Sequence, residues 1–357
     1  NLANVSLSGA DLTGANLTDA SLTGADLTDV DLSSAELSDL DASGANLTGA
    51  HLSDTDLTTV NLKSAILVVA DLSSVSLAGT DLSGVNLTGA NLTHTDLSGV
   101  NLTGVNLTGA NLTHTDLSGA NLTGANLTGL NLTGANLSDA NLSGANLSGG
   151  DLKGANLSGA NLTDADLTDA KLKGAILSDM NFTDVSLKFA DLSSADLRNS
   201  NFTGKDLRDV NLSGVDLTGS NLSGAELTNV NLTDATLLSA NLSGAHLSGA
   251  NLTNAHLSGA NLANVSLSGA DLTGANLTDA SLTGADLTDV DLSGADLTDL
   301  DVSGANLSGA DLSDRDLRSV KFTAATLSDS ALTSVRFACT DLSAVDLTAA
   351  NLTHPSF

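Results

Sequence analysis

The residues that could carry out chemistry in this sequence are spread at regular intervals rather than gathered in one motif. Asn or Asp recurs every five residues, usually followed two positions later by Ser or Thr. Columns of carboxylates could bind calcium, but the nonapeptide of calcium-binding β-rolls is absent, so we interpret them as solvated ladders. No Ser or Thr has a plausible His and acid partner for a catalytic triad within a regular repeat. We therefore expect a protein that is not an enzyme and binds no cofactor or metal.

The six histidines are the other candidate metal ligands. His94 and His114 stand twenty residues apart in two copies of Asn-Leu-Thr-His-Thr-Asp-Leu-Ser-Gly, so they should stack as neighbours. His246 and His256 are ten residues apart and should lie on opposite faces. A closed zinc site normally requires four ligands. We therefore interpret the histidines as surface residues.

Basic side chains are candidates for contact with a partner, because they are scarce in a chain of formal net charge −30. Seven of the twelve lie within 153–208. They either relieve charge beside the Asp columns or contact the acidic face of another molecule. The predicted contact residues, some of them twenty residues apart and two of them aromatic, are Lys153, Lys173, Lys188, Arg208, Arg315, Arg318, Lys321, Arg336, Phe337 and Phe357.

Two basic residues occupy positions where a small apolar residue normally stands. Lys205 and Arg315 each replace the Ala or Val that ends a unit of the repeat. Burial of an unpaired charge is costly, whereas a long side chain can bury its stem and extend its charged end to water. We therefore expect local distortion or such an outward path at both residues.

The elements that position these side chains follow from an apolar residue, nearly always Leu, at every fifth position from Leu2 to Leu352, without insertion or deletion. The exceptions within this range are Ala42, Phe182, Phe202, Val302, Phe322 and Phe337. On an α-helix a step of five residues rotates by about 140°, so these leucines would form no buried stripe. On one long strand they would alternate faces. Leu and the small residue two before it share a face, while the Asn or Asp between them points the other way. The chain must therefore turn once per unit, which predicts an all-β coil around a narrow Leu and Ala core.

The number of units in one coil follows from echoes twenty residues apart. Phe182 and Phe202 stand at this spacing, as do Phe337 and Phe357. Four units per coil give a square cross-section. At about 4.8 Å between coils, about 18 coils would form a rigid acidic rod of roughly 85 Å.

The pattern Ala-(Asp/Asn)-Leu-x-x resembles that of pentapeptide-repeat proteins, and it covers the whole chain, 1–357, as a single continuous solenoid. The resemblance implies a right-handed quadrilateral β-helix with the central Leu or Phe and the preceding small residue inward. It implies no single activity, because one fold carries many functions. Some members resemble DNA in charge and shape and inhibit gyrase.

A longer repeat overlies the short one. Residues 1–33 recur identically at 261–293, and the duplication extends over 1–97 and 261–357. The offset of 260 residues is thirteen coils, so every side of the coil stays aligned. Growth by addition of whole coils favours a structural role over one precise docking shape.

The two ends of the chain differ in chemistry. The repeat is in full register from Asn1, and an uncapped edge would expose backbone groups to which another chain could pair. The 315–357 stretch is predicted to be a C-terminal cap or contact end, where Pro355 would stop the ladder because it has no N–H.

These features predict a structural protein that associates end to end into a filament or an extended surface assembly. The alternatives are a DNA-mimicking protein that binds a basic groove such as that of gyrase, and an ice- or mineral-binding array of Ser and Thr rows. The expected partners are a second copy or a basic protein. Scarce basic charge argues against direct nucleic-acid binding, and no apolar run approaches the roughly 18 residues of a membrane helix. We expect an extracellular or cell-surface location rather than a cytoplasmic one.

Overall fold

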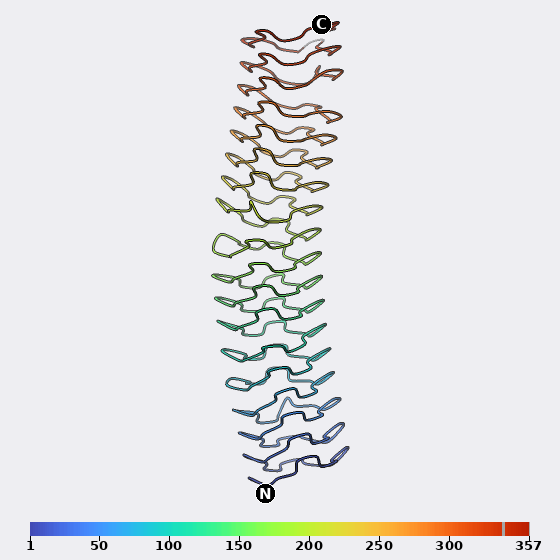
Figure 1. The fold of residues 1–357 in the computed structure, drawn as a ribbon, viewed down its shortest axis with the longest axis vertical. Helices are drawn as coiled ribbons and strands as arrows, with labels where there is room; N and C mark the ends of the chain where they lie inside the picture. The colour runs from blue at the N-terminus through green and yellow to red at the C-terminus, as the bar shows by residue number, and fades with distance from the viewer. Residues whose placement is uncertain (338–339, 357) are drawn as a thin grey trace. The chain divides into compact units, whose positions relative to one another are not determined.

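The structure, a computed structural model, describes residues 1–337 and 340–356. Phe357, which the sequence pairs with Phe337, lies outside the described residues. The chain divides into two compact units, unit 1 (Asn1–Ile176 and Asp184–Ala190) and unit 2 (Leu177–Thr183 and Asp191–Phe357). The backbone of each unit winds in successive coils (Figure 1). The described residues contain no helix with the length and apolarity needed to cross a bilayer.

Pairing between coils follows the predicted period of twenty residues. The β-structure consists of parallel bridges of single residues, such as Ser6 with Asp26 and Asp26 with Asn46. Around each bridge the backbone bonds run both ways: Leu7 N–H donates to Asp26 O at 2.8 Å, and Asp26 N–H donates to Val5 O at 2.9 Å. Each coil therefore contains four pentapeptides. We label its sides A to D: side A holds 1–5, side B 6–10, side C 11–15 and side D 16–20, each continued by the units twenty residues further on.

A tight turn closes each pentapeptide. Ala10 N–H, for example, donates to Leu7 O at 3.0 Å. The fourth residue of the unit has a positive φ, as in Gly9 at 68° and Asp19 at 58°. Gly, Asn and Asp tolerate this conformation best, which explains why they predominate at this position.

As predicted, the second and fifth residues of each pentapeptide form the core. Leu22, Ala25 and Leu27 are buried, as are most of their equivalents on the following coils as far as Phe337. Phe182 and Phe202 are also buried, and their rings stack with centroids 4.6 Å apart. This confirms the predicted pairing of aromatic residues one coil apart.

A few inward positions carry hydroxyl groups, and these are satisfied by the backbone. Ser200 Oγ donates to Leu177 O at 3.0 Å, and Ser220 Oγ donates to Leu197 O at 2.7 Å. Among the described residues, every buried side-chain N or O atom has a hydrogen-bond partner. Polar residues therefore enter this narrow core without the cost of an unpaired group.

The prediction that Pro355 stops the ladder is wrong. The ladder continues past it, because Ser356 N–H donates to Val335 O at 2.9 Å and Phe337 N–H donates to Ser356 O at 2.7 Å. At the fifth position of a unit the amide bonds within its own turn, as Ala350 N–H does to Leu347 O at 3.1 Å. Proline at this position therefore removes a turn bond and not a ladder bond.

Candidate functional site

The Asn and Asp columns serve first as acceptors within their own turns. Thr28 donates both its N–H and its hydroxyl to Asp26 Oδ1, at 3.2 and 2.7 Å. Asn46 accepts the same two bonds from Thr48, at 3.2 and 2.6 Å. The hydrogen bonds from Thr28 lower the pKa of Asp26 below its ordinary value. One oxygen of each such side chain is therefore occupied in holding the turn.

The same columns also join neighbouring coils. Asn61 Nδ2 donates to Asp41 Oδ1 at 3.0 Å, and Asn156 Nδ2 donates to Asn136 Oδ1 at 3.2 Å. These bonds confirm the interpretation of the columns as amide and carboxylate ladders. In the part of the chain that the structure describes, no three His, Cys, Asp or Glu side chains come close enough together to hold a metal ion.

The histidines are arranged largely as the spacing predicts. The rings of His94 and His114 stack with centroids 5.3 Å apart and an interplanar angle of 12°. This confirms that residues twenty apart lie one above the other. His246 Nε2 lies 3.8 Å from Glu226 Oε1. Both arrangements are surface contacts between adjacent coils.

The predicted contact residues of unit 1, Lys153, Lys173 and Lys188, lie close to other residues of unit 1. Lys153 Nζ contacts Asp151 Oδ2 at 3.0 Å. Gly154 N–H donates to Lys173 O at 3.0 Å, which places the turns of Lys153 and Lys173 on adjacent coils as predicted. Lys188 Nζ lies 4.9 Å from the centre of the Phe189 ring.

Most predicted contact residues of unit 2 pair with carboxylates of the same unit. Arg208 contacts Asp206 at 2.7 Å and Arg318 contacts Asp316 at 2.5 Å. The hydrogen bond from Arg318 is the main reason why the pKa of Asp316 falls to about 2. Two further ion pairs join Lys321 to Asp301 at 3.8 Å and Arg336 to Asp316 at 4.0 Å. Phe337 is buried, and its ring centre lies 6.2 Å from that of Phe322. Exposed ion pairs of this kind contribute little to stability, about 0–1 kcal/mol each.

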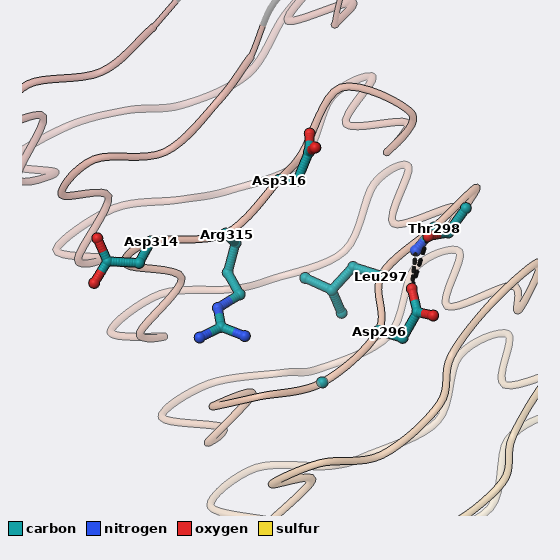
Figure 2. Close-up of a pocket in the computed structure, with 7 residues that line it drawn as sticks. Asp296, Leu297, Thr298, Asp314, Arg315 and Asp316 are labelled. Carbon is teal, nitrogen blue, oxygen red and sulfur yellow. Dashed lines mark hydrogen bonds between the residues drawn. The ribbon is translucent and has the colours of Figure 1, made fainter.

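Arg315 interrupts the ladder at the edge of side C. Figure 2 shows its guanidinium in an opening lined by Asp296, Leu297 and Asp314 among others. Arg315 Nε donates to Ser313 O at 3.2 Å. Within the described chain, Asp296 and Asp316 form no bridge, although Asp291 with Asp311 and Asp301 with Lys321 do on either side. The missing bridge marks a local distortion at Arg315, as the sequence predicts, and among the described residues bridges are likewise missing between Glu36 and Asp56 and between Asn61 and Asp81.

Lys205, the other inward charge, directs its ammonium group to a backbone carbonyl of the neighbouring coil. Its side chain is partly buried, and Nζ donates to Thr183 O at 3.3 Å. A backbone carbonyl therefore receives the ammonium group that the core cannot accommodate.

Removal of the Arg315 charge is expected to close the opening. In R315A, an alanine fits the inward position, so Asp316 N–H can bond to Ala295 O and Leu297 N–H to Asp316 O. Two such bonds correspond to a gain of about 1–3 kcal/mol in the free energy of unfolding. Urea unfolding measures this gain, and hydrogen exchange should show new protection at Leu297 and Asp316.

The matched control is R318A, which removes an exposed charge one unit further along. It loses only the surface pair with Asp316, so stability should fall by no more than about 1 kcal/mol. If R315A destabilises the protein, or if the amides of Leu297 and Asp316 stay unprotected, the opening does not result from the arginine.

Several exposed apolar residues are absent from the sequence-based prediction, and three of them lie on side B of unit 1. Val69 and Phe189 occupy fourth positions, at φ 50° and 60°, and Ile66 stands where Asn or Asp is usual. The exposed fractions are 59% for Val69, 52% for Phe189 and 41% for Ile66. The signal was available, because a bulky side chain at the fourth position breaks the turn rule of the repeat.

The sequence matches the family model of pentapeptide repeats over nearly its whole length. The matched segments are 1–34, 25–63, 35–72, 65–104, 101–139, 140–179, 165–204, 206–238, 240–279, 275–314 and 316–353. The chain therefore belongs to the pentapeptide-repeat family. Its members fold as right-handed quadrilateral β-helices, and the four-sided coil described above is this fold.

Among solved structures the chain is similar to other pentapeptide-repeat proteins. HetL of the cyanobacterium Nostoc, which is involved in the regulation of heterocyst differentiation, is 31% identical over 80% of this chain and 90% of that chain, with a TM-score of 0.16. QnrB1, a plasmid-mediated fluoroquinolone resistance protein, is 24% identical over 59% and 88%, with a TM-score of 0.24. A protein of the Arabidopsis thaliana thylakoid lumen is 27% identical over 44% and 71%, with a TM-score of 0.10. No curated protein matches the sequence.

Proposed function

We propose that this protein is a non-enzymatic structural protein whose β-helix associates end to end with further copies. A coil of a β-helix has unpaired N–H and C=O groups along any edge that no other coil covers, and such an edge pairs readily with another chain. A second copy can therefore continue the ladder.

The observation that carries the proposal is the identity of two coils. Residues 1–20 and 261–280 have the same sequence. Coil 241–260 stacks on one edge of coil 261–280. Leu242 N–H donates to Asn261 O and Leu247 N–H donates to Ser266 O, both at 2.7 Å. Coil 1–20 offers the same carbonyl groups in the same order. A second copy that stacks on coil 1–20 needs only a geometry that this chain already contains.

Prolines at Ser6 and Asp11 in coil 1–20 should prevent this stacking. The N–H groups of Ser6 and Asp11 donate to no described residue, whereas the equivalent Ser266 and Asp271 N–H groups donate to Ala245 O and Ala250 O, each at 3.0 Å. S6P/D11P should therefore lose the assembly, while the single chain loses no ladder bond but does lose the two turn bonds from Thr13 to Asp11 Oδ1, at 3.0 and 2.7 Å. Negative-stain electron microscopy and sedimentation velocity over a concentration series measure the strings of particles expected for the unchanged protein.

The interior equivalent provides the control. S266P/D271P loses the equivalent turn contact of Asp271 and two ladder bonds as well, so it should lower the midpoint of urea unfolding more than S6P/D11P does. A wild-type protein that stays a single particle at every concentration would contradict end-to-end association. Equal assembly by S6P/D11P would also contradict it.

The DNA-mimicking alternative is favoured by the acidic charge of the chain, −30 overall. A basic groove would attract such a surface. This function predicts that the protein inhibits DNA supercoiling by gyrase. Failure to inhibit over a wide concentration range would remove this alternative and leave the structural proposal untouched.

A further inference from the structure

Side B of unit 1 carries two bulky apolar residues in a conformation that disfavours both. Val69 and Phe189 have positive φ values of 50° and 60°, and more than half of each side chain is exposed. A positive φ is unfavourable for a β-branched or bulky residue, and such strain persists where it serves a function. Exposure adds the cost of hydrated apolar surface. Burial against a partner would recover the second cost.

The two residues belong to one column of turns. Bridges connect Ile66 to Asn86 and continue through every coil to Asp166 and Ser186. Asp169 N–H donates to Lys188 O at 2.9 Å, which places the Phe189 turn directly beside that of Asp169. Six coil steps separate Val69 from Phe189, or roughly 29 Å at 4.8 Å per coil. Side B thus has an apolar end at Ile66 and Val69 and a second at Phe189.

The surface between these ends carries no charge. Side B contains no charged residue from 46 to 150, in a chain with a net charge of −30. Four successive turns read Asn-Leu-Thr-Gly or Asn-Leu-Ser-Gly, at 86–89, 106–109, 126–129 and 146–149. Open space surrounds the Cβ position of Gly109, Gly129 and Gly149. A second acidic molecule can approach this surface closely and without charge repulsion.

We infer that side B is a lateral interface between two antiparallel copies of this chain, related by a twofold axis at residues 126–129. Such an axis makes one surface patch meet itself, as in most homodimers. Turn 66–69 of one copy then faces turn 186–189 of the other. Ile66 and Val69 contact Phe189 twice, once at each end, and the uncharged turns meet between them.

Charge selects the antiparallel arrangement over the parallel one. In a parallel pair in register, Asp166 and Asp169 would face the same two carboxylates of the other copy. In the antiparallel pair they face the uncharged turn 86–89. Lys188 Nζ, which lies 4.9 Å from the centre of the Phe189 ring, moves out to water as Ile66 and Val69 pack on the ring, and its methylene stem stays along the apolar end. This interface uses a side of the coil and does not depend on end-to-end association.

Charges at the two strained positions should dissociate the pair. Asp already fills the fourth position at Asp29 and Asp169 with φ near 55°, so V69D/F189D suits the local backbone better than the native residues. We expect sedimentation equilibrium to give a dimer mass for the S6P/D11P chain, in which end-to-end stacking is blocked, and at least a tenfold weaker association when V69D/F189D is added to that chain. S74D/S239D, which adds two charges at fourth positions of sides C and D, should leave the dimer intact.

Mixing two single variants tests the orientation. A V69D chain and an F189K chain should each associate weakly alone. In a mixed antiparallel pair, one end has an acidic side chain opposite a basic one and the other end keeps the native contact, so mixing should restore the dimer mass. A native chain that is monomeric at its solubility limit, or a V69D/F189D chain that dimerises normally, would overturn the interface. A mixture that stays dissociated would overturn the antiparallel arrangement.

The lateral and end-to-end interfaces can be separated with the edge variant. S6P/D11P should retain the dimer mass, because Ser6 and Asp11 lie outside the 66–189 column. V69D/F189D should retain any strings of particles, because it leaves coil 1–20 unchanged. The failure of one interface therefore does not imply the failure of the other.

Discussion

Replacement of Phe202 by alanine is expected to cost about 3–5 kcal/mol of the free energy of unfolding. Phe202 is fully buried, and its ring stacks on that of Phe182 at 4.6 Å. The backbone on both sides is fixed by ladder bonds, such as Phe202 N–H to Asn221 O at 2.7 Å. The coils therefore cannot close over the missing ring, and a cavity remains. Urea unfolding followed by circular dichroism measures the loss.

The matched control is F202L, which retains most of the apolar volume. Leucine fills the equivalent position on the next coil, Leu222, where it is buried. F202L should therefore lose much less stability than F202A. Because solenoids can unfold in parts, hydrogen exchange at Asn201 and Asn221 should show that the loss in F202A is greatest near the cavity. A cost below about 1 kcal/mol for F202A would mean that the core collapses around the deletion.

Acid is expected to destabilise the protein strongly, because many turns depend on an ionised Asp. The hydrogen bonds from Thr28, Ser43 and Thr273 lower the pKa values of Asp26, Asp41 and Asp271 below the ordinary 3.8. A carboxylate with a lowered folded-state pKa contributes stability that is fully present above its unfolded pKa. That contribution is lost as the pH falls from about 4 toward the folded values, which for Asp316 is about 2.

Protonation also relieves the repulsion among the chain's many acidic groups, which acts in the opposite direction. The pKa values fall in spite of this repulsion, so the loss of hydrogen bonding should prevail. The measurement is the urea midpoint at pH 6 and pH 3, on protein dilute enough to be monomeric. An unchanged midpoint would contradict the prediction.

Asparagine provides an exact test of the cause, since the chain uses it in the same turns. Asn46 accepts two bonds from Thr48, as Asp26 does from Thr28. D26N/D41N/D271N should therefore keep the turns and lose three titrating groups. Its urea midpoint should fall less between pH 6 and pH 3 than that of the native chain. An equal fall in both proteins would place the acid sensitivity elsewhere.

The sequence by itself determined the fold and the interior. A period of five residues with Leu and a small residue two apart permits one solution, a coil that turns once per unit, and echoes at twenty residues set four units per coil. These inferences depend on spacing along the chain. They predicted the stacking of Phe182 on Phe202 and of His94 on His114, and the distortion at Arg315, which the structure confirms.

Tertiary structure decided which charged surface groups pair with a neighbour and which backbone hydrogen bond is lost at a proline. Most of the basic residues proposed as contacts lie against carboxylates of their own unit, as Arg318 does at Asp316, because the turn brings residues two apart together. Pro355 leaves the ladder intact, because the N–H at the fifth position of a pentapeptide bonds within its own turn and not to a neighbouring coil. Val69 and Phe189 became a pair only when the coil placed them in one column. The proposed lateral interface depends on such a column, and the column brings together residues that are far apart in the sequence.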